Sequence, residues 1–197
     1  NMNSKLEPAS ITKIMTAILA IENCDLNDTV TVPYEAISNI PSGYSIVPLQ
    51  TDEQITVDQL LRVLMVHSAN DAANVLAEHI AGSISSFATM MNTKAAEIGC
   101  TGTHFVNPNG IHNKNHYSTA YDLALMGRYA MQNETFRKIV TTTKYTLPST
   151  NKFPEPTRFF KATNDLIIPD SRDSVDNYYY FYATGIKTGY TNAAGNC

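Results

Sequence analysis

The sequence has little charge and no long apolar run, and each shortage excludes a class of protein. Only 16% of the 197 residues are charged and the formal net charge is −4, so no basic surface favours nucleic acid as a partner. The longest apolar run near the start, residues 14–21, is interrupted by Thr16 and is too short to cross a bilayer. No signal peptide precedes this run, so an exported form would have had its leader outside these residues.

Cysteine and metal-binding patterns are also sparse. Cys24, Cys100 and Cys197 form an odd set without C-x-x-C spacing, so the sequence predicts buried, inert thiols and neither a disulfide framework nor a zinc site. His112 and His116 are four residues apart, but no helical pattern places them on one face and no Glu follows His112. We therefore expect histidines that stabilise a loop, with no metal and no cofactor.

The chain does contain enough apolar residues, 43%, to bury one sizeable core, and we expect a single domain over residues 1–197. Thr56 and Gln59 form a capping box, Thr119 caps a later helix, and Gly82 and Gly99 follow the ends of two others. Periodicity predicts helices near residues 9–22, 57–67, 72–81, 86–98, 120–130 and 136–140. Strands are predicted near residues 30–32 and 44–47 and over residues 178–190.

Ser10 and Lys13 lie three residues apart at the start of the first predicted helix. This spacing places both side chains on one helical face, and free N–H groups in the first turn favour negative charge developing at Ser10. A lysine amine takes a serine proton when burial or a neighbouring cation lowers its pKa. The pair predicts a nucleophilic serine with a lysine base; the alternative is a first-turn serine followed by a solvated lysine.

A second polar motif, Ser68-Ala69-Asn70, falls in the turn between two predicted helices. Side chains in such a turn are able to point into a cleft. The alternative is that Asn70 or Asp71 only caps the helix that follows.

The third motif, Lys187-Thr188-Gly189, follows the aromatic run at residues 178–182, which favours a strand. A strand edge offers main-chain N–H groups to an extended peptide, and the adjacent lysine and hydroxyl suit a carboxylate. Gly185 and Gly189 would permit close approach of a ligand or another backbone. The alternative is an ordinary surface turn.

Ser-x-x-Lys, Ser-x-Asn and Lys-Thr-Gly, in this order, are the motifs of penicillin-binding proteins and class A β-lactamases. The sequence resembles the serine D-alanyl-D-alanine carboxypeptidases, the low-molecular-mass penicillin-binding proteins, from about residue 7 to its end. The stretches that carry the resemblance are residues 8–17, 68–73, 105–108, 116–123 and 185–191.

The resemblance implies catalytic roles for four residues. Ser10 would attack the carbonyl between the two terminal D-alanines of a peptidoglycan stem peptide and form an acyl-enzyme, with Lys13 as its base. Ser68 would relay a proton toward the leaving amine, and Asn70 would bind the substrate amide and hold Lys13.

Substrate binding is implied for the residues around the third motif. Lys187 would keep Lys13 neutral and attract the substrate carboxylate, with Thr188 bonding the same group. Gly189 would let the ligand approach, and the N–H groups of Ser10 and Tyr190 would form an oxyanion hole.

The implied fold is α+β, of the β-lactamase and transpeptidase type. The family has further strands before the first motif and after the third, so we expect these 197 residues to hold mainly its helical portion and the Lys-Thr-Gly strand. The missing strands would belong to the rest of a truncated protein, to a partner or to a swapped copy. The resemblance also implies a bacterial, extracytoplasmic location, peptidoglycan stem peptides as substrate, covalent inhibition by β-lactams, and any membrane anchor in segments outside this chain.

Two other activities use the same motifs. Class A β-lactamases have Ser-Asp-Asn where this chain has Ser68-Ala69-Asn70, and no Glu-x-x-Leu-Asn stretch supplies a deacylating carboxylate. A DD-transpeptidase differs only in the acceptor of the acyl group. A non-catalytic cell-wall-binding fragment would keep the motifs for recognition alone.

Overall fold

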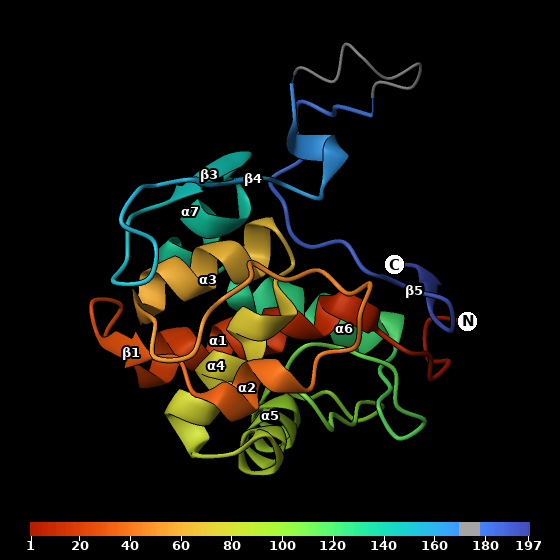
Figure 1. The fold of residues 1–197 in the computed structure, drawn as a ribbon. Helices are drawn as coiled ribbons and strands as arrows, with labels where there is room; N and C mark the ends of the chain where they lie inside the picture. The colour runs from red at the N-terminus through yellow and green to blue at the C-terminus, as the bar shows by residue number, and fades with distance from the viewer. Residues whose placement is uncertain (170–177) are drawn as a thin grey trace.

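The computed structural model describes residues 1–169 and 178–197 and is mostly helical in these parts (Figure 1). The helices are α1 (Lys13–Asn23), α2 (Tyr34–Ser38), α3 (Val57–Val66), α4 (Asn70–Ala81), α5 (Ile84–Ile98), α6 (Ala120–Ala130) and α7 (Glu134–Val140). The 3₁₀ helices are η1 (Ala9–Thr12) and η2 (Asp165–Ile167). The strands are β1 (Thr29–Thr31), β2 (Gln54–Thr56), β3 (Lys144–Leu147), β4 (Arg158–Lys161), β5 (Tyr190–Thr191) and β6 (Gly195–Asn196).

Helix α1 forms the centre of the helical layer, where it contacts α3, α4, α5, α6 and α7 (Figure 1). Its residues from Lys13 to Ala20 are all buried, because apolar side chains occur on every face of this helix. The predicted helix over residues 9–22 is confirmed from Lys13 onward. Its start is different: Ala9 has a φ of 46°, outside the α region, and the chain enters through the tighter turn of η1.

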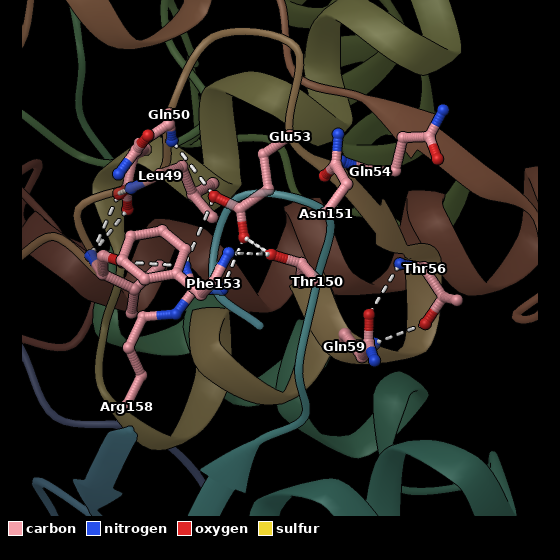
Figure 2. A network of polar contacts seen from close by, with 12 residues as sticks. Leu49, Gln50, Glu53, Gln54, Thr56, Gln59, Thr150, Asn151, Phe153 and Arg158 are labelled. Atoms are coloured by element: carbon pink, nitrogen blue, oxygen red, sulfur yellow. Dashed lines mark hydrogen bonds and ion pairs between the residues drawn. The ribbon is translucent and has the colours of Figure 1, made fainter. Parts of the chain in front are cut away.

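The predicted capping signals are confirmed by hydrogen bonds. Thr56 Oγ1 accepts from Gln59 N at 3.2 Å and Gln59 Oε1 accepts from Thr56 N at 2.9 Å, so the capping box fixes the start of α3 (Figure 2). Gly82 and Gly99 end α4 and α5 with φ angles of 71° and 93°, which glycine adopts without strain. Thr119 Oγ1 accepts from the backbone N–H three residues later and starts α6.

The strands form three separate two-stranded antiparallel sheets, β1–β2, β3–β4 and β5–β6. The strand predicted near residues 30–32 is confirmed by β1, in which Val30 pairs with Ile55. The strand predicted at residues 44–47 is wrong, because side chains rather than a neighbouring strand hold this irregular segment.

The strand predicted over residues 178–190 is also wrong, except at its end in β5. The exposed fraction of Phe181 is 75% and that of Tyr182 is 74%, so the aromatic run has no buried face. Strand propensity reflects packing against neighbours, and among the described residues no strand pairs with this run.

Of the three cysteines, Cys100 is buried as predicted, but Cys24 is only half-buried and Cys197 is exposed. The prediction of three buried thiols is therefore wrong for two of them. In the described ranges, every helix is too short or too polar to span a bilayer.

The end of the chain returns to its beginning. Strands β5 and β6 lie beside the segment that leads into η1 (Figure 1), and Sγ of Cys197 is 3.8 Å from the carbonyl oxygen of Glu7. This return places the third motif next to the first.

Candidate functional site

An open cleft of about 680 Å³ lies between η1, the turn from α3 to α4, and the residues around β5. Six of the eight predicted site residues line it: Ser10, Ser68, Asn70, Thr188, Gly189 and Tyr190. The other two, Lys13 and Lys187, do not line it.

Lys13 lies at the start of α1 with an exposed fraction of 0%. Its Nζ is 2.9 Å from Oγ of Ser10, 2.9 Å from Oδ1 of Asn70 and 2.7 Å from the carbonyl oxygen of Asn109. All three oxygens are uncharged. The alternative of a solvated lysine is therefore excluded by the structure.

The surroundings of Lys13 disfavour its charged form. Burial lowers the pKa of Lys13 well below its usual range, and the positive charge of Lys187 lowers it further, while Asp71 acts in the opposite direction. A lysine held in this way exists as a neutral amine at a far lower pH than a surface lysine. It is therefore able to accept a proton from the hydroxyl 2.9 Å away.

The turn between α3 and α4 presents Ser68 and Asn70 to the cleft. Ser68 has a φ of 63°, which bends the chain sharply between the two helices. The residue that caps α4 is Ala69, and the Asn70 side chain bonds Lys13 and the carbonyl oxygen of Ser45 instead. The capping alternative is therefore wrong for Asn70.

The loop over residues 105–116 closes the far side of Lys13. Thr16 Oγ1 donates to the carbonyl oxygen of Pro108 at 2.6 Å, which fixes the loop on α1. A Cβ at Gly110 would lie 1.8 Å from the carbonyl oxygen of Ala9, so only glycine permits this approach. The loop thereby holds the carbonyl oxygen of Asn109 against Lys13.

The two histidines of this loop make local contacts. His116 is buried, its Nε2 lies 2.8 Å from Oγ1 of Thr12, and burial lowers its pKa to about 4, helped by His104. His112 Nδ1 lies 2.7 Å from a carboxylate oxygen of Glu7. Within residues 1–169 and 178–197, no group of three His, Cys, Asp or Glu side chains could hold a metal ion.

Gly189 brings the third motif against Ser10. A Cβ at this position would lie 3.2 Å from the backbone N of Ser10 and from the carbonyl oxygen of Pro8. Gly189 also exchanges both of its backbone hydrogen bonds with Cys197. In an antiparallel pair the next N–H, that of Tyr190, points away from the partner strand.

Thr188 and Lys187 differ from the sequence-based expectation in position. They precede β5 rather than lie within a strand. Thr188 Oγ1 is in the cleft, 2.7 Å from Oγ1 of Thr163, whereas Lys187 Nζ donates to the carbonyl oxygen of Thr188 and does not line the cleft. Burial lowers the pKa of Lys187 to about 8.

Three residues near this site were missed by the sequence-based analysis. Asn109 acts through its backbone carbonyl, which carries no side-chain signal. Ser45 also acts through its backbone carbonyl. Thr163 acts through its side chain, but threonine is too common in this sequence for its residue type to be a signal.

A serine, a buried lysine and an asparagine amide, brought together on a helical core beside the backbone of Gly189, define the class of active-site-serine enzymes with a transpeptidase-like fold. The family model of the D-alanyl-D-alanine carboxypeptidases matches residues 1–197. The chain belongs to this family.

Individual proteins agree with this assignment. The chain is 35% identical over 203 residues to D-alanyl-D-alanine carboxypeptidase DacF of Bacillus subtilis, a match that covers 100% of this chain and 48% of the relative. It therefore spans about half the length of that relative.

Solved structures show the same fold. A Streptomyces DD-transpeptidase superposes with a TM-score of 0.85 at 33% identity, covering 99% of this chain and 75% of the other. A D-alanyl-D-alanine carboxypeptidase from Mycobacterium tuberculosis superposes with a TM-score of 0.84 at 32% identity, covering 100% of this chain and 68% of the other. The predicted transpeptidase-like fold is confirmed, here as mostly helices with small sheets.

Proposed function

We propose that the protein is a serine DD-carboxypeptidase that removes the terminal D-alanine from peptidoglycan stem peptides through an acyl-enzyme on Ser10. The observation that carries this proposal is the 2.9 Å contact between Ser10 Oγ and the wholly buried Nζ of Lys13. Family membership supports the substrate class, and we infer an extracytoplasmic location at the bacterial cell wall from the same membership.

The hydrogen bonds around Lys13 indicate the direction of proton transfer. A neutral lysine amine has two N–H donors and one lone pair. Asn70 Oδ1 and the carbonyl oxygen of Asn109 accept the two donors, so the lone pair faces Ser10. Lys13 then takes the Ser10 proton as Oγ attacks the carbonyl carbon between the two D-alanines.

The remaining steps use groups around the cleft. The N–H groups of Ser10 and Tyr190 would stabilise the tetrahedral oxyanion, a contribution of ~3 kcal/mol for each donor. The C–N bond breaks, Ser68 passes its proton to the leaving D-alanine amine and takes up the proton held by Lys13, and the acyl group stays on Oγ. Water then adds to the ester carbon, which releases the shortened peptide and restores the Ser10 hydroxyl.

Substrate orientation would come from the third motif. Thr188, with Lys187 behind it, suits the C-terminal carboxylate of D-alanine through one hydroxyl and one nearby positive charge. A β-lactam presents a similar carboxylate and a strained amide, so we expect it to acylate Ser10 as a slowly hydrolysed mimic.

A DD-transpeptidase is the second candidate, because the Streptomyces enzyme that superposes with this chain is named as one. The two activities share the acyl-enzyme and differ in whether water or an amine accepts the acyl group. Hydrolysis of β-lactams and non-catalytic wall binding are the further alternatives that the same cleft allows.

Intact-mass measurement after incubation with benzylpenicillin tests the proposal, with Ser10→Ala as the control. We expect one stable penicillin adduct in the wild type, none in the variant, and release of D-alanine from a D-Ala-D-Ala peptide by the wild type alone. An amine-linked product when an amino acceptor is added would favour the transpeptidase. Rapid consumption of penicillin without an adduct would favour the β-lactamase. A folded protein that gives no adduct, no consumption and no D-alanine would refute the catalytic proposal.

A further inference from the structure

The side chain of Asn70 bonds both Lys13 and the irregular segment over residues 44–50. The carbonyl oxygen of Ser45 accepts from the backbone N–H of Asn70 at 2.9 Å and from its side-chain Nδ2 at 2.8 Å. A side-chain amide donates on one side and accepts on the other. Because Nδ2 is directed to Ser45, Oδ1 is directed to Lys13 Nζ.

Asp71 ties this segment to the start of α4. The residue directly follows Asn70 and has an exposed fraction of 2%. Its Oδ2 accepts from Val47 N at 2.9 Å and from Leu49 N at 3.2 Å. The carboxylate therefore accepts from backbone N–H groups that would otherwise need a neighbouring strand. These N–H groups lie two and four residues after Ser45.

A buried ion pair holds the other end of the segment (Figure 2). Glu53 and Arg158 form this pair with exposed fractions of 0% and 8%. Glu53 also accepts from Gln50 N at 3.1 Å and from Thr150 Oγ1 at 2.9 Å, and Arg158 Nη1 lies 3.5 Å from the carbonyl oxygen of Val47.

We propose that Asp71 is a positioning residue for the acylation step, with the Glu53–Arg158 pair as a second anchor. These three side chains fix the segment over residues 44–50 and thereby the position of the Ser45 carbonyl oxygen. That oxygen in turn fixes the orientation of the Asn70 amide against Lys13. A buried ion pair contributes little net stability compared with apolar residues of the same volume. Three buried charges that converge on one segment beside the cleft are better accounted for by the geometry that they impose.

The test compares Asp71→Asn with a matched control, Asp122→Asn. Asp122 is also 2% exposed in the first turn of a helix, and it accepts loop donors from Gly102 N at 2.8 Å and Thr103 Oγ1 at 2.7 Å. The measurement is the second-order rate constant of acylation by benzylpenicillin. It is normalised to the number of protein molecules that can be acylated at all. We expect Asp71→Asn to slow acylation by about ten- to a hundredfold, since charge-assisted bonds to the segment are lost, and Asp122→Asn to leave the rate constant unchanged.

A double-mutant cycle with Asn70→Ala separates positioning from general destabilisation. If Asp71 acts through the Asn70 amide, Asp71→Asn slows acylation much less in the Asn70→Ala background than in the wild type. Equal fold-changes in both backgrounds would overturn the proposal, and so would equal acylation rates for Asp71→Asn and Asp122→Asn.

A second variant guards against misfolding of Asp71→Asn. Glu53→Leu combined with Arg158→Met removes the other anchor and replaces the ion pair by apolar side chains. We expect acylation to slow by about three- to tenfold in this double variant, and an unchanged rate constant in a folded protein would overturn the proposal. The role assigned to Asp71 rests on the proposed function: a wild type that is not acylated overturns both, whereas an acylated wild type with an unaffected Asp71→Asn overturns the positioning role alone.

Discussion

Lys13 and Arg158 are both cations inside the protein, with exposed fractions of 0% and 8%, but their partners differ. Arg158 contacts the carboxylate of Glu53, whereas the oxygens around Lys13 belong to a hydroxyl, an amide and a carbonyl. A buried charge without an opposite charge is costly, so the lysine tends to lose its proton, whereas the guanidinium of Arg158 has a carboxylate beside it. The difference teaches that burial alone does not define the environment of a cationic residue, because the charge of its partners differs.

The largest expected effect comes from removing the base. Lys13→Met keeps the length and apolar character of the buried stem but has no lone pair of an amine to offer Ser10. We expect the rate constant of acylation by benzylpenicillin to fall by about 10²- to 10⁴-fold, the usual contribution of a general base. Stopped-flow or intact-mass kinetics would measure it, and a rate within tenfold of the wild type would show that another group deprotonates Ser10.

Breaking the ion pair should affect folding strongly. Glu53→Leu leaves the guanidinium of Arg158 buried without its carboxylate, at an expected cost of ~3–5 kcal/mol in the free energy of unfolding. Adding Arg158→Met should restore most of that loss. Urea denaturation measures both, and a single variant as stable as the wild type would mean that water reaches Arg158 readily.

The pH dependence of stability should reveal the lowered pKa of Lys13. Burial lowers the pKa of Lys13 in the folded state from an ordinary value of 10.5. Below pH 10.5 the unfolded chain therefore binds a proton at Lys13 that the folded chain releases, so this residue disfavours folding at neutral pH and stops doing so above pH 10.5. The stability of Lys13→Met relative to the wild type should be greater at pH 7 than at pH 10. A difference independent of pH would indicate that Lys13 stays charged in the folded protein.

Replacing Lys187 should have a smaller effect on acylation than replacing Lys13. The positive charge of Lys187 lowers the pKa of Lys13, and burial lowers its own pKa to about 8. In Lys187→Gln we expect the acidic limb of the acylation profile to move to higher pH and KM for a D-Ala-D-Ala peptide to rise about tenfold. In the wild type, kcat/KM should fall as the pH rises through about 8, because neutral Lys187 no longer attracts the substrate carboxylate. Profiles measured from pH 5 to pH 10 would reveal either change, and identical profiles for the two proteins would remove Lys187 from the site.

The sequence predicted the local features of this structure well, because local features are set by neighbouring residues. The capping pair Thr56 and Gln59 acts over three residues, and the spacing of Ser10 and Lys13 is itself a helical contact. The three motifs were recognisable from their residue types together with their order along the chain. The capping and helix predictions alone required no knowledge of distant parts of the chain.

Features that depend on distant partners were not predicted. Glu53 and Arg158 meet across 105 positions, and nothing in either neighbourhood indicates the other. The aromatic run at residues 178–182 has high strand propensity but lies exposed, because a strand requires a partner that residue types alone do not specify. Asp71 was considered only as a helix cap, since a side chain that binds the backbone of residues 47 and 49 leaves no periodic signal.

A third cation completes the comparison with the smallest expected effect. Arg62 donates to Asp58 at 2.7 Å on α3, and both side chains are about one-third exposed. Water already solvates both charges, so Asp58→Asn should lower the free energy of unfolding by only ~0.5 kcal/mol, with a smaller loss in 1 M NaCl, and should leave acylation unchanged. Urea denaturation at two salt concentrations measures this. A loss as large as that of Glu53→Leu would mean that burial does not decide how much a paired cation contributes, and the contrast between Arg158 and Arg62 would then need another cause.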